Sequence, residues 1–245
     1  MRLLIKETTP YNEISVYETT ELYGKKGSYR ILRFADEAVQ GAMDLEDPGR
    51  VVLEYQRAVI HLLRTNAPSF ANVFSVGHGI GTIAAHDPDK RFVVAEIDGK
   101  LEEFSRRYFG YGLDNVRIGD GRELLEREEP DTYDAIVVDA FTHEGTPSHF
   151  TTLEFFAMAK TKLISRGTVI LNLFGKRNND RLTDAIHSTL GEAFEYTKVF
   201  FRPGNEADNE GNLMIAGSDK RIDYKERQMP GFREIDIGKG YIIRD

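Results

Sequence analysis

The sequence predicts an α/β protein with a doubly wound, mostly parallel sheet, preceded by a small antiparallel β-domain. From Asn72 onward, apolar runs of strand length alternate with segments of helical periodicity, and such alternation is typical of parallel sheets with crossover helices. Upstream, short β-branched and aromatic runs are separated by Pro10 and Gly24, which is typical of antiparallel strands. We therefore predict a β-domain over residues 1–50 and an α/β domain over residues 51–245.

The expected elements follow one another in a regular order. The β-domain has three strand-like runs, and a helix over residues 51–63 leads into the α/β domain. Its parallel strands are expected at 73–76, 92–97, 116–118, 135–138 and 169–173. Helices are expected between them at 101–108, 123–128, 153–163 and 181–190. An antiparallel hairpin of 196–201 and 213–216 ends the sheet, and the residues beyond 217 show no pattern.

Composition narrows the class of protein. The chain is 40% hydrophobic and 29% charged, as globular proteins are. Its net charge of −8 argues against nucleic-acid binding, which depends on clustered Lys and Arg. No apolar run approaches the ~18 residues that span a bilayer, and the first residues lack a signal-peptide core. We expect a cytoplasmic protein that binds neither membranes nor nucleic acid, and the absence of cysteine excludes disulfides and thiolate chemistry.

Two neighbouring strand ends indicate a nucleoside site. The first predicted parallel strand runs into a loop with glycines at Gly77, Gly79 and Gly81. Such glycines allow a sharp turn and the close approach of a nucleoside, although ordinary strand-to-helix turns share this spacing. The next strand ends in Glu96, whose carboxylate can accept hydrogen bonds from both hydroxyls of a ribose. A solvated strand end is the alternative for Glu96.

The following two strands also end in acids. Asp120 lies between Gly119 and Gly121, and Asp139 ends the apolar run of the fourth strand. A charge at the end of a buried strand costs free energy unless it contacts a ligand or solvent. Since the carboxyl ends of parallel strands meet at one edge of the sheet, the glycine loop and the three acids predict one cofactor site there. For Asp139, a structural role in capping the next turn is an equal alternative.

The order VFSVGHGIG, VVAEID, IGDGRELL and YDAIVVDAF resembles the spermidine synthases, or polyamine aminopropyltransferases, and their relatives. These proteins share the Rossmann-like fold of class I S-adenosylmethionine-dependent methyltransferases. The resemblance extends over most of residues 36–175 and includes Gln40 and the segment Leu53-Glu54-Tyr55-Gln56.

Roles for individual residues follow from this resemblance alone. It implies that Gln40 and Gln56 contact the nucleoside, that Glu96 holds the ribose, and that Asp120, with Gly121 beside it, meets the adenine amino group. It implies that Asp139 is the base and that Tyr55 positions the acceptor. The family also implies a homodimer.

The function implied is transfer of an aminopropyl-type group from decarboxylated S-adenosylmethionine to a small-molecule amine acceptor, without a metal. A carboxylate suits the base because it attracts an ammonium group, accepts its proton and stabilises the positive charge of the donor. Two departures stand against this activity. Ile80 and Thr142 occupy positions where the family has acids that grip cationic groups.

Three alternatives remain open. A methyltransferase would use intact S-adenosylmethionine, whose carboxylate an acid at position 80 would repel. A non-catalytic relative would keep the nucleoside pocket without turnover. An NAD-dependent dehydrogenase fits the glycine loop, but the strand ends at Asp120 and Asp139 fit it less well. The segment 142–149 resembles the family's gate loop, and although it contains two histidines and a glutamate, we predict no metal site.

Overall fold

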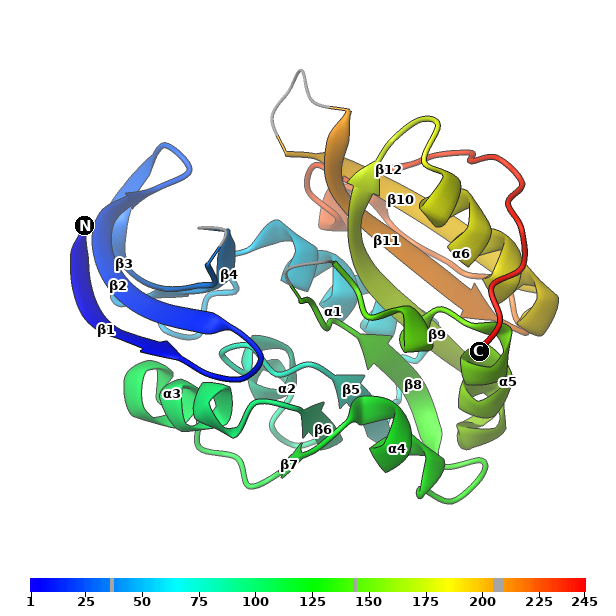
Figure 1. Cartoon of the computed structure of the whole chain (residues 1–245), viewed down its shortest axis with the longest axis horizontal. Helices are drawn as coiled ribbons and strands as arrows, with labels where there is room; N and C mark the ends of the chain where they lie inside the picture. The colour runs from blue at the N-terminus through cyan, green and yellow to red at the C-terminus, as the bar shows by residue number, and fades with distance from the viewer. Residues whose placement is uncertain (36–37, 143–144, 205–208) are drawn as a thin grey trace.

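The structure is a computed structural model that describes residues 1–35, 38–142, 145–204 and 209–245. It contains two sheets, and the smaller one is antiparallel and lies at the N-terminal end of the chain (Figure 1). Its four strands follow chain order: β1 (Arg2–Thr8), β2 (Glu13–Leu22), β3 (Lys25–Arg33) and β4 (Val39–Asp44). Within the described residues, no helix combines the length and the apolar content that crossing a membrane requires.

The larger sheet has eight strands in the order β12-β10-β11-β9-β8-β5-β6-β7. From β9 to β7 neighbouring strands are parallel, whereas β11, β10 and β12 add antiparallel pairs. The strand bounds are β5 (Asn72–Val76), β6 (Arg91–Glu96), β7 (Val116–Ile118), β8 (Tyr133–Val138), β9 (Leu163–Lys176), β10 (Tyr196–Pro203), β11 (Glu210–Ser218) and β12 (Arg233–Glu234). The strand order reverses between β5 and β8, so this point of the sheet is where a ligand is expected.

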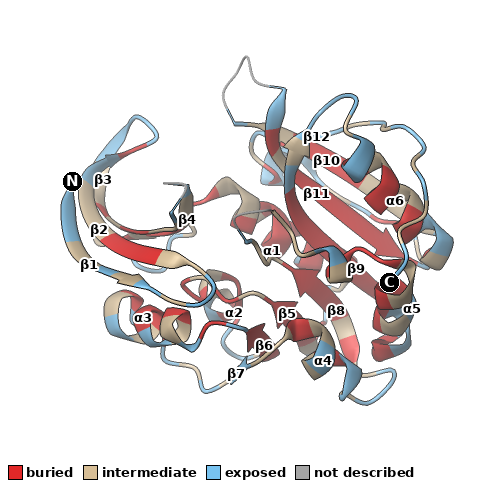
Figure 2. Cartoon of the chain, in the orientation of Figure 1, coloured by how far each residue is buried: buried red, intermediate tan, exposed pale blue. Residues whose placement is uncertain are grey.

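Helices cover both faces of the large sheet, and its central strands are buried (Figure 2). In β5, Val73 belongs to the core shared with α1 (Glu54–Asn66) and α2 (Thr82–His86), while Phe74 faces the opposite core. That second core includes α4 (Gly121–Glu126), α5 (Leu153–Lys162) and α6 (Arg181–Ala193). Two short 3-10 helices complete the chain, η1 (Ser148–Phe150) and η2 (Glu226–Gln228).

Ile80 joins the small sheet to the α/β domain. It is 7% exposed and packs with α3 (Gly99–Phe109) and with side chains of β2 and β3, including Val16 and Leu32. The backbone of β4 approaches closely, since a Cβ at Gly41 would lie 2.5 Å from Cγ2 of Ile80. The hydrophobic cluster between the sheets is therefore made by β2, β3, Ile80 and α3, and it joins the small sheet to the α/β domain.

Several elements differ from the sequence prediction. The strand β4 was not predicted, because Gly41 and the polar residues of Val39–Asp44 weaken the apolar pattern. The helix α1 begins at Glu54 rather than at residue 51, since its N-cap Leu53 is extended. Beyond residue 217 the chain forms η2 and β12, which are too short to show periodicity. The domain boundary at residue 50 stays a prediction.

Replacing Ile80 with alanine should destabilise the protein by about 2–5 kcal/mol, because it opens a cavity in the cluster between the sheets. Urea denaturation would measure this free energy of unfolding. Leu182→Ala is the matched control, since Leu182 is 56% exposed and its truncation should cost no more than about 0.5 kcal/mol. Equal losses in the two variants would contradict the shared cluster.

Candidate functional site

A cavity of about 340 Å³ lies at the carboxyl ends of β5, β6 and β8, beside the reversal of strand order. The N-terminal sheet contributes to its wall through Phe34 and through residues 10–12 of the β1–β2 turn. Each site residue predicted from the sequence lines this cavity: Gln40, Tyr55, Gln56, Gly77, Gly79, Gly81, Glu96, Asp120, Gly121 and Asp139.

The glycine loop is shaped by close packing within the protein. Gly77 has a φ of 92°, and a Cβ there would lie 2.1 Å from the carbonyl oxygen of Asp139, because β5 and β8 come together at this point. Gly81 has a φ of 83°, and its Cβ would lie 2.1 Å from the ring of Tyr111. These two glycines are therefore needed for the fold of the loop itself.

Glu96 fastens the glycine loop to the end of β6. It is 6% exposed, and its two carboxylate oxygens accept hydrogen bonds from the backbone N–H groups of His78 and Asp98, both at 2.9 Å. Burial raises the pKa of Glu96 to about 7, although these backbone N–H groups act in the opposite direction. Each carboxylate oxygen has a second lone pair, so the side chain can still accept hydrogen bonds from a ligand.

Asp98 links the end of β6 to the N-terminal sheet, and the sequence analysis did not predict this link. One carboxylate oxygen caps α3 by accepting from the backbone N–H of Lys100 at 3.0 Å. The other accepts from the hydroxyl of Thr9, in the turn between β1 and β2, at 2.6 Å. The neighbouring Pro10 and Tyr11 line the cavity. An aspartate directly before a helix is a usual N-cap, but nothing in the sequence indicates the distant partner Thr9.

Asp120 caps α4 as well as lining the cavity. Its Oδ1 accepts from the backbone N–H groups of Arg122 at 2.9 Å and Glu123 at 3.0 Å. Its Oδ2 lies 3.0 Å from Nε2 of His149, which is the last residue of the gate-loop segment and also lines the cavity. The side chain of His149 is 41% exposed, so it contacts both Asp120 and solvent.

Asp139 lies in a network of neutral hydrogen-bond donors. Its Oδ1 accepts from Nδ2 of Asn172 at 2.8 Å, and the hydroxyl of Tyr55 is near enough to influence the carboxylate. Burial raises the pKa of Asp139 to about 6, and the neighbouring Asn172 and Tyr55 side chains oppose this increase. Burial and the neighbouring carboxylate raise the pKa of Tyr55 well above its ordinary value. Asn172 was missed, although a polar residue inside the apolar run VILNLF was a usable signal.

Gln56 provides a further test of whether a nucleoside fits. Its Nε2 donates to the hydroxyl of Tyr55 at 3.3 Å, and this hydroxyl is 3.2 Å from the carbonyl oxygen of Gln40. Oε1 of Gln56 is buried and has no hydrogen-bond partner among the described residues. A buried acceptor without a partner is costly. The hydroxyl and amino groups of a nucleoside would supply donors to this oxygen and to the carboxylates, so the cavity fits such a ligand.

The two positions that depart from the family pattern have different surroundings. Ile80 is in the cluster between the sheets and is not among the described residues that line the cavity. Thr142 does line it, and its hydroxyl donates to the carbonyl of Gly145 at 3.0 Å. His143 and Glu144 of the gate loop lie outside the described residues. Among those described, no group of three or more His, Asp or Glu side chains is arranged to hold a metal.

A comparison with models of known protein families identifies the family to which this chain belongs. Residues 52–225 match the spermine/spermidine synthase domain, which is more than half of the chain. The chain belongs to this family. The matched stretch includes Tyr55, Glu96, Asp120 and Asp139, whereas Gln40 precedes it.

Individual relatives agree with the family. A polyamine aminopropyltransferase from Vibrio vulnificus (strain CMCP6) is 27% identical over 218 residues, which are 83% of this chain and 70% of that protein. A crystal structure of a probable spermidine synthase from Corynebacterium glutamicum ATCC 13032 has a TM-score of 0.78 at 22% identity, over 91% of this chain and 82% of that one. A crystal structure of human methyltransferase-like protein 13 in complex with SAH has a TM-score of 0.59 at 23% identity, and the match covers 76% of this chain and 96% of that one. The predicted methyltransferase-like fold is thereby confirmed.

Asp139→Asn should stabilise the protein at pH 8 and have little effect near pH 4. The folded-state pKa of about 6 is above the value of about 3.9 expected in the unfolded chain. The carboxyl therefore contributes its full stability below pH ~4 and loses it as the pH rises through about 6. Thermal unfolding at the two pH values would measure this. The control is Asp89→Asn, at an exposed acid, and a Tm gain that is equal at both pH values would contradict the assignment.

Proposed function

We propose that this protein transfers an aminopropyl group from decarboxylated S-adenosylmethionine to a small amine, with Asp139 as the base. The observation that supports this most strongly is the Asp139 carboxyl at the end of β8, in a chain that belongs to the spermine/spermidine synthase family. The Vibrio vulnificus relative is named a polyamine aminopropyltransferase. The protein is accordingly proposed to be a transferase of the same class.

The surroundings of Asp139 suit proton transfer from an ammonium group. A pKa near 6 leaves the carboxylate ionised at neutral pH but basic enough to accept a proton. The hydrogen bond from Asn172 fixes one oxygen, and Tyr55 on α1 is also close to the carboxylate. The carboxylate would attract the protonated acceptor, receive its proton and leave the nitrogen lone pair free to attack.

The proposed reaction is a substitution at the carbon of the aminopropyl group that is bonded to sulfur. The donor contributes a sulfonium, which makes methylthioadenosine the leaving group. A C–N bond forms to the acceptor nitrogen, the C–S bond breaks with its electron pair on sulfur, and the acceptor proton passes to Asp139. Asp139 also stabilises the sulfonium charge before the step, since it is an anion in a partly desolvated cavity.

The opposite part of the cavity is proposed to hold the adenosine. Glu96 would accept hydrogen bonds from the ribose hydroxyls, and Gln40 and Gln56 would contact the nucleoside beside it. Asp120, with Gly121, would meet the adenine amino group, because Oδ2 has a lone pair beyond its contact with His149. The free acceptor on Gln56 supports this arrangement.

Methyl transfer from intact S-adenosylmethionine is a second candidate. The observation that favours it is the absence of an acid at position 80, since Ile80 is committed to the cluster between the sheets. A donor carboxylate would then meet no repulsion from that position. A non-catalytic nucleoside-binding relative is the third candidate, and it would share the cavity but not the turnover. We also propose a homodimer, on the basis of the family alone.

The decisive assay incubates the protein with decarboxylated S-adenosylmethionine and a panel of monoamines and diamines, and follows the products by mass spectrometry. The proposal expects an aminopropylated amine and an equal amount of methylthioadenosine. Asp139→Asn should lower the rate about 10²–10⁴-fold, the usual contribution of a positioned base, whereas Asp89→Asn should not. Methylated product from intact S-adenosylmethionine would favour the second candidate, and nucleoside binding without any product would favour the third.

A further inference from the structure

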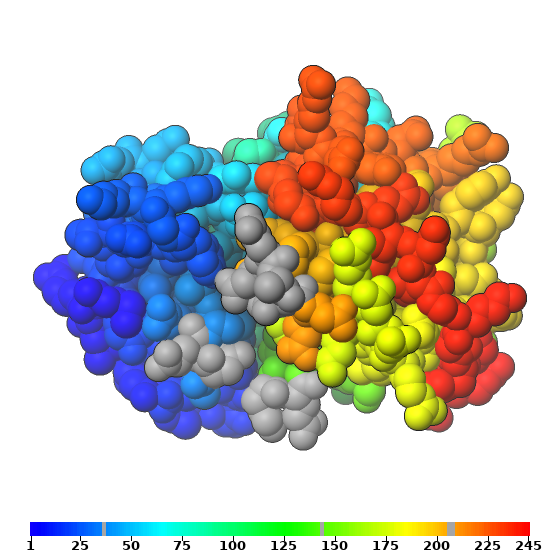
Figure 3. All heavy atoms as spheres, turned by 90° about the horizontal axis from the view of Figure 1, so that it is seen from above, coloured from blue at the N-terminus to red at the C-terminus, as the bar shows by residue number. Residues whose placement is uncertain are grey.

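The C-terminal segment, residues 235–245, is fastened along the surface of α6 and α5. In Figure 3 the red C-terminal segment lies beside the yellow helix α6. Its backbone N–H groups donate to side chains of α6: Gly238 to Asp184 at 2.9 Å, Gly240 to Ser188 at 2.8 Å and Ile243 to Thr189 at 2.9 Å. Each of these bonds gives a hydrogen-bond acceptor to a backbone N–H group that lies outside any helix or strand. The segment therefore has a defined path that ends beside α5.

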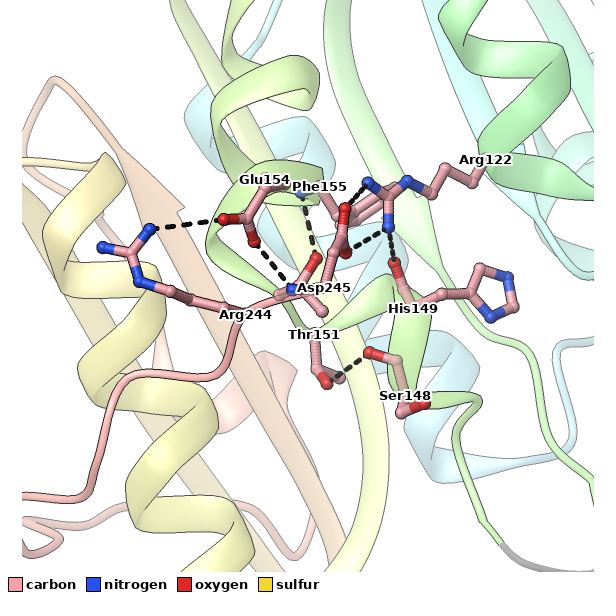
Figure 4. Close-up of polar contacts among 9 residues, drawn as sticks. Arg122, Ser148, His149, Thr151, Glu154, Phe155, Arg244 and Asp245 are labelled. Atoms are coloured by element: carbon pink, nitrogen blue, oxygen red, sulfur yellow. Dashed lines mark hydrogen bonds and ion pairs between the residues drawn. The ribbon is translucent and has the colours of Figure 1, made fainter.

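The end of this segment contacts Arg122, on the first turn of α4 (Figure 4). The two carboxylate oxygens of Asp245 accept from Nη1 and Nη2 of Arg122 at 2.7 and 2.5 Å, a bidentate pair. The backbone N–H of Asp245 donates to Glu154 at 3.1 Å, and Arg244 contacts the other oxygen of the same carboxylate. Glu154 thus holds the backbone of Asp245 where its side chain meets Arg122.

Arg122 continues the chain of contacts to the cavity. Its Nη1 also donates to the carbonyl oxygen of His149 at 3.1 Å, while the ring of His149 contacts Oδ2 of Asp120. Asp120 in turn accepts from the backbone N–H of Arg122. The three residues form a closed ring that connects α4 with η1, and both Asp120 and His149 line the cavity.

We propose that Asp245 and Arg122 are positioning residues for the nucleobase end of the cavity. Asp245 orients Arg122, Arg122 holds the backbone carbonyl of His149, and the placement of His149 in turn orients Asp120. This inference rests on the proposed function, in which Asp120 meets the adenine amino group. A bidentate partner limits the orientations of the guanidinium group. Arg122 is thereby held where one of its N–H groups reaches the carbonyl of His149.

A global stabilising role is not needed to explain the pair. The side chain of Asp245 is 45% exposed and that of Arg122 is 24% exposed, and ion pairs near the surface contribute little to overall stability. Their removal should therefore leave the Tm nearly unchanged and affect the segment that contains His149. The reacting centre at Asp139 belongs to a separate network, so the chemical step should also be preserved.

The test compares Arg122→Gln and Asp245→Asn with the control variant Arg127→Gln. Arg127 is an exposed arginine at the end of α4, and among the described residues it pairs only with Glu123. We expect the first two variants to bind methylthioadenosine about threefold to tenfold more weakly by calorimetry, the range for one hydrogen bond. The donor KM should rise by a similar factor while kcat stays within about twofold. The double variant should be no weaker than Arg122→Gln, because both residues act through one chain of contacts.

Hydrogen exchange of residues 147–152 in the ligand-free variants provides a measurement independent of the donor. Faster exchange in Arg122→Gln and Asp245→Asn, but not in Arg127→Gln, would support the inference. Unchanged affinity, KM and exchange in both variants would overturn it. Failure of the unaltered protein to bind methylthioadenosine would instead contradict the proposed function, and the exchange result would then decide whether the two residues position the His149 segment.

Discussion

The buried carboxylate of Glu96 is the interaction on which the cavity depends. By accepting N–H groups from His78 and Asp98, it fixes the glycine loop at one end and the start of α3 at the other. Asp98 then accepts from Thr9, so the turn between β1 and β2 is held over the same cavity. The glycine loop and the N-terminal turn, which are far apart in sequence, are therefore connected through the carboxylates of Glu96 and Asp98. The pKa of Glu96, raised to about 7 by burial, reflects the electrostatic cost of this arrangement.

Much of this arrangement could be predicted from the sequence, because it depends on local pattern. Apolar runs of strand length identified the parallel strands, and the rule that their carboxyl ends share an edge brought Glu96, Asp120 and Asp139 together. Glycines at positions 77 and 81 identified the turn. We expected glycine at these positions to allow a nucleoside to approach. The structure shows that both glycines are required by contacts within the protein, Gly77 with the carbonyl of Asp139 and Gly81 with the ring of Tyr111.

The remainder could not be predicted because it depends on contacts between distant residues. Nothing near Thr9 indicates Asp98 as its partner, and nothing near Asp245 indicates Arg122. The C-terminal segment shows no periodicity because side chains of α6, rather than a neighbouring strand, satisfy its backbone. Ile80 looked like a lost acid at the site, but the structure shows that its side chain packs against β4 and α3, so its effect on ligand choice is indirect.

The central claim is that this cavity binds a donor of the decarboxylated S-adenosylmethionine type. Calorimetric competition among S-adenosylmethionine, its decarboxylated form, methylthioadenosine and S-adenosylhomocysteine tests it most directly. Aminopropyl transfer predicts tighter binding of the decarboxylated form and of methylthioadenosine. Tighter binding of S-adenosylmethionine and S-adenosylhomocysteine would contradict that donor and favour methyl transfer, and binding of none of the four would contradict the nucleoside site itself.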